Sequence, residues 1–371
     1  MESHTVKMEN LVYQVFGVVK HKGLIWSVII SSILFTSCGE SVKEPSTVFN
    51  SIEIHGETQG TTYTVIVVEK DKTLDKAQLD SLFSSFDMVL STYIDESIIS
   101  QFNNCQDSIV LADNSHLFER CYRSSQHVYS KTKGLFDPSV YPLVKSWGFM
   151  NNMNSPLSKK EVKDILDYVS FEAGKHHNLI FTPEGKVLGN KYNANFKLDM
   201  NAIAQGLSVD VVDEFLKSKG CSNYFIEIGG ELIVRGHNRE GDTWRIGVDV
   251  PKENLATREL ENIILVSEKA IATSGNYRKF YVKDGLKYAH TLNPLTGFPV
   301  QHSLLSVTVI AETCDLADGY ATAFMVMGTE KTLSFVKNNP DEKLEVYLLF
   351  SGEDGEIERA MSEGFEKYLK K

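Results

Sequence analysis

The stretch from Lys197 to Glu231 constrains the fold of this chain more than any other segment. Gly220 follows two lysines and suits a helix C-terminus, and residues 223–228 alternate like a half-buried strand before two glycines. The pattern predicts a buried strand end, a helix and a second strand, which together are typical of an α/β layer. The predicted helix carries one apolar stripe at four-residue spacing, made of Ile203, Leu207, Val211 and Phe215.

Three polar side chains, Asp199, Asn201 and Gln205, stand at the predicted start of this helix. The first N–H groups of a helix have no partner within the helix, and they carry a partial positive charge. Because an anionic group binds well at such a terminus, we expect a polar ligand here.

The rest of the chain carries both strand and helix signals. Residues 51–55 and 61–68 predict two strands joined through residues 56–60, and residues 74–90 predict an amphipathic helix with a polar exit that includes Tyr93. Residues 134–149 combine glycines, prolines and aromatics, which predicts an irregular, aromatic-lined loop. This composition suits a loop that seals the core as well as one that lines a binding site.

The first residues indicate where the protein resides. Lys20 and Lys22 precede an apolar run, residues 23–37, that suits the core of a signal peptide, and small residues then precede Cys38 as in a bacterial lipobox. We expect a lipoprotein signal peptide over residues 1–37, lipidation of Cys38, a polar tether over 38–48 and a folded part over 49–371. An uncleaved anchor helix is the alternative. Both readings predict a periplasm-facing protein bound to the bacterial cell envelope.

The chain is acidic, with a formal net charge of −11. Removing residues 1–37 takes away three lysines and two glutamates, so the charge of the mature chain becomes −12. Binding to nucleic acid requires clustered lysines and arginines, so no nucleic-acid partner is expected. A ligand that carries phosphate would need a cation to bridge it to such a protein.

The other cysteines lack the spacing of a zinc site. Small buried residues and a disulfide between two of them are both open readings in an oxidising compartment. These cysteines are Cys105, Cys121, Cys221 and Cys314.

Asp318 and Thr322 form a candidate metal pair. The pattern after Cys314 is helical, so a spacing of four residues places the carboxylate above the hydroxyl on one helix face. Such a pair suits a hard cation such as Mg²⁺, although an aspartate in a first turn often serves only the helix dipole. His290, at the predicted end of a strand, is a candidate acid–base group or phosphate contact, and a purely structural role is the alternative.

Eight motifs taken together resemble the ApbE-type family, the FAD:protein FMN transferases. The resemblance implies an α/β (α+β), two-lobed fold, with mixed or antiparallel sheets and packed helices that enclose an FAD site. It also implies Mg²⁺-dependent transfer of FMN from FAD to a threonine of a target redox protein, with release of AMP. The motifs, in chain order, are GTTYTV, STYIDESIISQFN, GLFDPSVYPLVKSWGF, LDMNAIAQGLSVD, YFIEIGGE, IATSGNY, HTLNPLTGFPV and TCDLADGYATAFMVMG.

The resemblance assigns roles to individual residues. It implies a metal held by the Asp318 carboxylate, the Thr322 hydroxyl and the backbone carbonyl of Ala202, with Asp318 and His290 as the catalytic groups. The positions implied to contact the flavin nucleotide are Gln59, Tyr93, Leu135, Phe136, Asp137, Asp199, Gln205 and His290.

This chain departs from the family pattern at three positions. Gln59 stands where methionine is usual, Gln205 where many members have lysine, and Asn293 where aspartate is frequent. The second departure removes a positive charge expected to contact phosphate. We expect activity to survive, with a changed affinity or rate.

Two alternatives to the transferase remain open at this stage. A Mg²⁺-dependent FAD pyrophosphatase would use the same metal site and give FMN and AMP. A non-catalytic FAD-binding lipoprotein is the second alternative, which the lost lysine favours and the intact Asp318–Thr322 pair opposes. The resemblance implies an exported or membrane-bound redox protein as the acceptor, and the chain does not specify which one.

Overall fold

A computed structural model describes residues 49–69, 72–148, 157–251, 260–276, 280–283, 286–289 and 291–370, which belong to one compact unit. The predicted signal peptide and tether, Cys38 and His290 lie outside these residues and stay predictions. Within the described ranges, no helix is long and apolar enough to cross a membrane.

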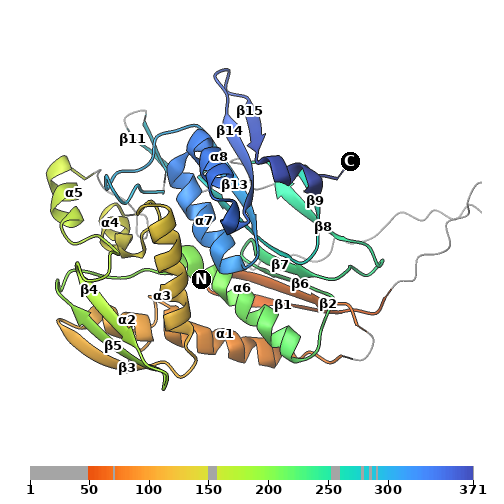
Figure 1. Ribbon diagram of the computed structural model, residues 1–371, viewed down its shortest axis with the longest axis horizontal. Coiled ribbons are helices and arrows are strands. Elements are labelled where there is room, and N and C mark those ends of the chain that lie inside the picture. Colours follow the sequence, from red (N-terminus) through yellow and green to blue (C-terminus); the bar gives the residue numbers. More distant parts are fainter. Residues whose placement is uncertain are drawn as a thin grey trace, which may run out of the picture. The chain divides into compact units, whose positions relative to one another are not determined.

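An antiparallel sheet of eight strands, in the order β1-β2-β6-β7-β10-β13-β14-β15, forms the centre of this unit (Figure 1). Each strand pairs antiparallel with its neighbours. The strands are β1 Ile52–Thr58, β2 Thr61–Val67, β6 Tyr224–Ile228, β7 Glu231–Arg235, β10 Lys269–Gly275, β13 Leu304–Ala311, β14 Glu345–Ser351 and β15 Ile357–Met361.

Smaller antiparallel groups of strands and a set of helices complete the described fold. The smaller groups are β3 Ser108–Ala112, β5 Lys186–Lys191 and β4 His177–Phe181; β8 Trp244–Asp249 and β9 Leu260–Val266; and β11 Phe280–Lys283 and β12 Leu286–Ala289. The α-helices are α1 Lys76–Leu90, α2 Ile98–Asn104, α3 Leu117–Lys131, α4 Tyr141–Ser146, α5 Lys159–Leu166, α6 Asn201–Ser218, α7 Cys314–Met327 and α8 Thr329–Asn338. The predicted α+β class is confirmed.

The large sheet is covered on both faces. Helices α6 and α7 pack on one face, where Ile233 of β7 meets Val212 of α6 in one apolar cluster (Figure 1). The neighbouring Leu232 and Val234 belong instead to a cluster on the other face, with Trp244 of β8. Since successive side chains of a strand point to opposite faces, β7 is apolar at consecutive positions.

The helix expected from the Lys197–Glu231 pattern is confirmed as α6, and the second strand as β6. The expected strand end before the helix is wrong, because residues 195–200 adopt no strand. The side chain of Asn103 takes the place of a strand partner: its Nδ2 donates to the Leu198 carbonyl at 2.7 Å, and its Oδ1 accepts from the Leu198 N–H at 2.7 Å. Buried side chains alternate along residues 196–200 as in a strand, but these residues pair with no other strand.

Two expected connections differ from the structure. The connection between β1 and β2 is shorter than the predicted one over residues 56–60. It is a two-residue turn at Gln59 and Gly60, whose φ angles are 51° and 74°. Both central φ angles are positive in a type I′ hairpin turn. The expected irregular loop over residues 134–149 contains the short helix α4. Pro142 does not prevent this helix, because it lies in the first turn, where proline is tolerated.

The four cysteines in the described part of the chain are free, so the disulfide alternative is wrong for them. Cys121 and Cys314 are buried, and desolvation raises the pKa of both thiols. They act as small apolar residues of the core.

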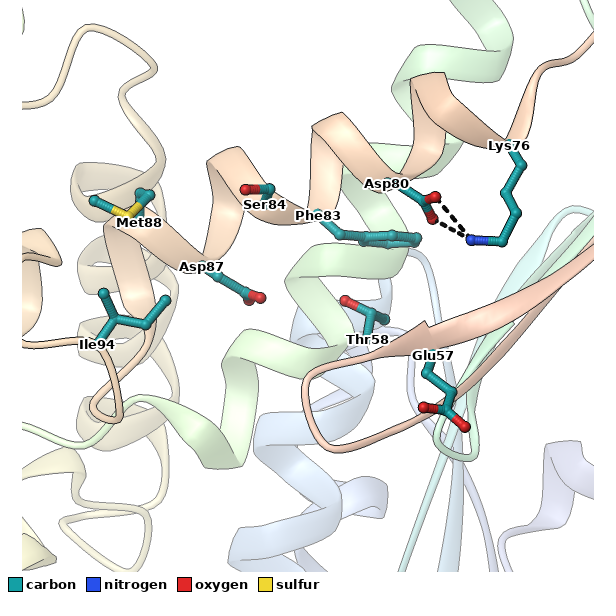
Figure 2. A pocket seen from close by; sticks show the side chains of 9 residues that line it. All are labelled: Glu57, Thr58, Lys76, Asp80, Phe83, Ser84, Asp87, Met88 and Ile94. Atoms are coloured by element: carbon teal, nitrogen blue, oxygen red, sulfur yellow. Dashed lines mark hydrogen bonds and ion pairs between the residues drawn. The ribbon is translucent and has the colours of Figure 1, made fainter.

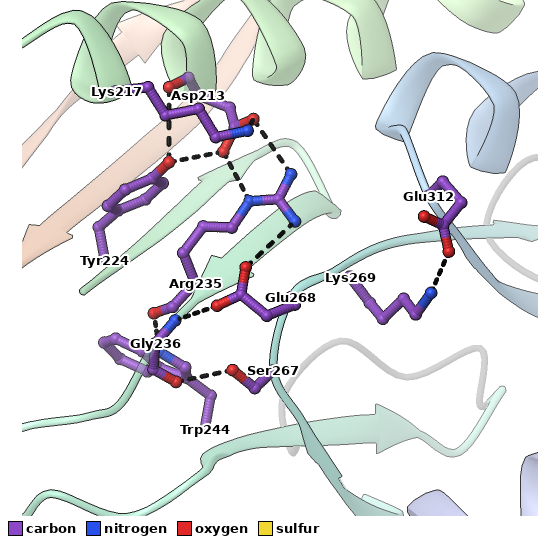
Figure 3. Close-up of polar contacts among 10 residues, drawn as sticks. All are labelled: Asp213, Lys217, Tyr224, Arg235, Gly236, Trp244, Ser267, Glu268, Lys269 and Glu312. Carbon is purple, nitrogen blue, oxygen red and sulfur yellow. Dashed lines mark hydrogen bonds and ion pairs between the residues drawn. The ribbon is translucent and has the colours of Figure 1, made fainter. Parts of the chain in front are cut away.

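A buried ion pair anchors α6 to the sheet (Figure 3). Arg235 of β7 donates from Nε and Nη2 to the two carboxylate oxygens of Asp213 at 2.9 and 3.1 Å. Lys217 and the Tyr224 hydroxyl also donate to this carboxylate, at 2.6 and 2.8 Å. Although burial opposes ionisation, Arg235 and Lys217 hold the pKa of Asp213 below its usual value.

We predict that Asp213→Asn lowers the free energy of unfolding by about 3 kcal/mol at pH 7, because it leaves the buried Arg235 guanidinium without its counter-charge. A depressed folded-state pKa contributes stability that is present above the unfolded value, about 3.9, and is lost as pH falls through the folded value. The difference between wild type and variant, measured by urea unfolding, should therefore shrink below about pH 4.

The matched control is Asp164→Asn, which removes the exposed ion pair with Lys160. Exposed pairs contribute at most about 1 kcal/mol. Equal losses for the two variants at pH 7 would contradict the anchoring role of Asp213.

Candidate active site

The candidate site is built where α6 and α7 cross closely. An added Cβ on Gly206 of α6 would lie 2.2 Å from the Cys314 carbonyl oxygen and 2.9 Å from the Asp318 Cβ, so only glycine fits at this crossing. The Gly206 N–H donates to Asp318 Oδ2 at 3.1 Å. In a regular helix this N–H serves the carbonyl of Ala202, so Asp318 competes for that donor at the first turn of α6.

Asp318 and Thr322 stand one turn apart on α7, as their spacing predicts. Asp318 is 5% exposed and has no lysine or arginine partner among the described residues, whereas Thr322 is half-buried. Desolvation raises the pKa of Asp318 to about 7; the Gly206 N–H lowers it, and the charge of Asp315 adds to the rise. A buried carboxylate in this environment is stabilised by a bound cation or a proton.

The donor set fits a hard cation. The predicted donors are the Asp318 carboxylate, the Thr322 hydroxyl and the Ala202 carbonyl. Carboxylate, hydroxyl and carbonyl oxygens suit Mg²⁺, which keeps its remaining positions for water and phosphate oxygens. Across the described ranges, no group of three or more His, Cys, Asp or Glu side chains could hold a metal, so a purely side-chain site of that kind is absent there.

Glu231 is a site residue that the sequence analysis missed. It is 8% exposed at the start of β7, and its Oε2 accepts a hydrogen bond of 2.6 Å from Gln205 Nε2. Desolvation, together with the negative charge of Asp318, raises the pKa of Glu231 well above its ordinary value. The sequence did contain a signal for this residue. A charged side chain is unusual directly after Gly229 and Gly230, at the start of a buried strand.

Two of the three departures from the family pattern lie together. The Ser208 hydroxyl is 3.2 Å from Gln59 Oε1 and 2.7 Å from the Gln205 carbonyl oxygen, so it links the β1–β2 turn to α6. The Gln59 Nε2 is buried and has no hydrogen-bond partner in the described part of the chain. An unsatisfied buried donor of this kind calls for water or a ligand.

The loops that carry Asp199 and residues 134–137 also meet. The Asp199 N–H donates to the Pro138 carbonyl at 2.7 Å, and Asp199 Oδ1 accepts from the Asn201 N–H at 2.9 Å. Tyr93 is 75% exposed, and Asp199 adds to the effect of partial burial in raising the pKa of its phenol. These predicted nucleotide contacts therefore converge in front of the α6 N-terminus.

Contacts with the protein interior hold the segment from Leu135 to Asp137 in place. Phe136 belongs to the main apolar core, and the Asp137 carboxylate accepts from the N–H and hydroxyl of Ser139 at 2.7 and 2.6 Å. It also accepts from the Phe171 N–H, and desolvation raises its pKa to about 6. The half-buried Leu135 side chain and the backbone are the parts of this segment left to face a ligand.

The third departure, Asn293, is explained by its turn. Its Oδ1 accepts from the N–H groups of Leu295 and Thr296 at 2.9 and 3.3 Å, as a carboxylate oxygen would. Asparagine therefore preserves the turn that follows His290 in the chain.

A cavity of about 350 Å³ lies between the β1–β2 hairpin and α1 (Figure 2). Its wall contains Thr58 and Ile94, the chain neighbours of Gln59 and Tyr93. The other residues that line it are Glu57, Lys76, Asp80, Phe83, Ser84, Asp87 and Met88. The end of the β1–β2 hairpin and a largely exposed face of α1 thus leave space between them.

The structure is that of an α+β protein in which Asp318, a predicted cation ligand, lies at the crossing of α6 and α7. A comparison with known protein families identifies the family of this chain. The sequence profile of the ApbE family matches residues 59–348, so the chain belongs to the ApbE family.

The relatives support this assignment along nearly the whole chain. An FAD:protein FMN transferase of Vibrio cholerae is 32% identical over 93% of this chain and 99% of its own length, and that of Escherichia coli K12 is 28% identical over 92% and 96%. Among solved structures, the flavin transferase ApbE from Vibrio cholerae matches with a TM-score of 0.74 at 30% identity, covering 86% of this chain and 100% of that chain. The apo flavinyl transferase ApbE of Pseudomonas stutzeri matches with a TM-score of 0.74 at 27% identity, covering 86% of this chain and 97% of that chain.

We predict that Gly206→Ala lowers the free energy of unfolding by about 2 kcal/mol, because the new methyl group meets the backbone of α7 and overpacks the crossing. It should also reduce the site's activity at least tenfold, as the Asp318 carboxylate moves away from the first turn of α6. Gly319→Ala, whose Cβ would meet only side chains at 3.1 Å or more, is the control and should cost less. Equal effects of the two changes would contradict the crossing as the determinant of the site.

Proposed function

We infer that this chain is an FAD:protein FMN transferase, an enzyme that moves the FMN part of FAD onto another protein. The extent of the ApbE match and the names of the relatives support this activity. The single structural observation that carries it is the hydrogen bond from the Gly206 N–H of α6 to Asp318 of α7, one helical turn from Thr322.

We propose Mg²⁺ as the metal of this site, held by the Asp318 carboxylate, the Thr322 hydroxyl and the Ala202 carbonyl. When bound, Mg²⁺ supplies positive charge that offsets the charge developing on the pyrophosphate. The acidic chain itself offers no lysine or arginine to Asp318 or Glu231 within its described part.

The chain's own residues bind and orient the substrate. The exposed ring of Tyr93 provides a face for an aromatic group, and the free donor of Gln59 suits an acceptor atom of the nucleotide. In the transfer, the hydroxyl oxygen of an acceptor threonine forms a bond to the FMN phosphorus. The bond from that phosphorus to the bridging oxygen breaks, and AMP leaves with the electron pair.

The hydroxyl proton needs an acceptor. We assign this role to His290, directly or through one water, because the resemblance to the family implies a catalytic role for this residue. The nucleophile belongs to the acceptor protein, for which we propose an exported or membrane-bound redox subunit. This division explains why the chain needs no serine or cysteine nucleophile of its own.

In-gel flavin fluorescence tests the function. The purified protein is incubated with FAD, Mg²⁺ and a redox subunit that carries a candidate threonine segment, and a covalent fluorescent band on the acceptor is the expected result. Release of FMN and AMP without a band, at the same rate with and without acceptor, would instead identify a pyrophosphatase. FAD binding with no AMP release would identify a non-catalytic flavin carrier.

We predict that Asp318→Asn reduces transfer at least 100-fold, because it removes the charged ligand for the metal. Mg²⁺ should raise the melting temperature of the wild type, since a ligand that binds only the folded state stabilises it, and this rise should vanish in the variant. Thr322→Val should lose less, because the hydroxyl carries no charge. Asp341→Asn, at an exposed position, is the control; a Mg²⁺ effect that persists in Asp318→Asn would contradict the site.

We also propose that Cys38 is lipidated and that the enzyme is anchored in the bacterial cell envelope, facing the periplasm. The apolar run over residues 23–37 and the small residues before Cys38 support this location.

We predict that the full chain, expressed in a bacterium, partitions into the membrane fraction and that Cys38→Ser prevents both cleavage after residue 37 and lipid attachment. Intact mass spectrometry and labelling with a fatty acid measure the two events. Cys105→Ser is the control and should leave both unchanged. Lipid label retained in Cys38→Ser would contradict the assignment.

A further inference from the structure

The short helix α2 ends beside the segment that leads into α6. Its buried residue Asn103 accepts the Leu198 N–H at Oδ1 and donates from Nδ2 to the Leu198 carbonyl oxygen, each at 2.7 Å. Leu198 is itself fully buried, so its two backbone groups depend on a protein partner. Because one side chain serves both groups, it fixes the position of this backbone relative to α2.

Asn103 is held in place by two lysines. Its carbonyl oxygen accepts from Lys197 Nζ at 2.8 Å and from Lys191 Nζ at 3.1 Å. Lys191, the last residue of β5, also donates to the Cys105 carbonyl oxygen at 3.0 Å. The last carbonyl groups of a helix have no partner within the helix, and lysine ammonium groups stabilise them. The C-terminus of α2 is therefore a fixed point to which the backbone of Leu198 is attached.

Asp199 directly follows this attachment. The side chains on either side of it, Leu198 and Met200, are buried in the main apolar core, whereas Asp199 is half-buried. Its N–H donates to the Pro138 carbonyl oxygen at 2.7 Å, and its Oδ1 accepts from the Asn201 N–H at 2.9 Å. The position of the Asp199 carboxylate thus depends on the backbone that Asn103 holds.

We propose that Asn103 is a positioning residue for FAD: by holding the Leu198 backbone, it fixes where Asp199 lies and thereby sets how tightly the nucleotide binds. The proposal rests on the proposed function, since Asp199 is a predicted contact of the nucleotide. Asn103 is buried behind this segment and acts through it. The proposal gives a role in substrate binding to α2, a helix that contains none of the predicted nucleotide contacts.

The dissociation constant of FAD, measured with Mg²⁺ on the whole protein by quenching of flavin fluorescence, tests this proposal. Asn103→Ala removes both hydrogen bonds to Leu198 and should weaken FAD binding about tenfold. Asn103→Asp keeps the acceptor for the Leu198 N–H but places a second oxygen against the Leu198 carbonyl. It should also weaken binding, and it replaces the alanine variant in the test if that variant does not fold. Asn104→Ala, at the exposed last position of α2, is the control and should leave the constant unchanged.

A double-mutant cycle with Asp199→Ala separates positioning from a general loss of stability. Once Asp199 is alanine, the change at Asn103 should have almost no further effect on FAD binding, because the group that it positions is absent. An equal further loss in both backgrounds would overturn the proposal. A merely structural Asn103 would lower the melting temperature and leave the dissociation constant of the folded protein unchanged, which would overturn it too.

The outcomes also distinguish this proposal from the proposed function. Wild-type FAD affinity in a folded Asp199→Ala protein would overturn the positioning role alone, because Asp199 would then have no part in binding, and the transferase activity would stand. Failure of the wild type to bind FAD would overturn both.

Discussion

The crossing of α6 and α7 at Gly206 is the contact on which the candidate site depends. Each helix is placed independently by the large sheet, α6 against β6 and β7, and α7 against β10 and β13 (Figure 1). Only the missing side chain of Gly206 lets the two backbones meet closely enough for its N–H to reach Asp318. The predicted donors of the cation site thus belong to two elements that are far apart in the sequence.

The carboxylates around this crossing are stabilised in different ways. Asp210 of α6 accepts the N–H groups of Cys314 and Asp315 at 2.8 and 2.9 Å, so it caps the start of α7. The unpaired donors of a helix N-terminus can stabilise such a charge. Asp318 lies in the next turn, where it accepts one N–H, that of Gly206, and therefore has fewer backbone donors than Asp210 to offset its charge.

The three departures from the family pattern have different consequences. Asn293 reproduces the hydrogen bonds of a turn, so its effect on the site is small. The Gln59 side chain accepts from the Ser208 hydroxyl of α6, whereas the Gln205 side chain donates to the Ile228 carbonyl and to Glu231. The structure therefore gives the two glutamines different hydrogen-bond partners.

The sequence by itself determined the local features: the helix after Asp199, the β1–β2 hairpin and the spacing of Asp318 and Thr322. These follow from the periodicity of helices and strands, which is a property of short segments. Its motifs also identified the family. Only the tertiary structure decided that Asn103 replaces a strand partner for Leu198, and that Glu231 holds Gln205. Such contacts join elements from distant parts of the chain, and their geometry depends on how the whole sheet and its helices pack, which no local pattern encodes.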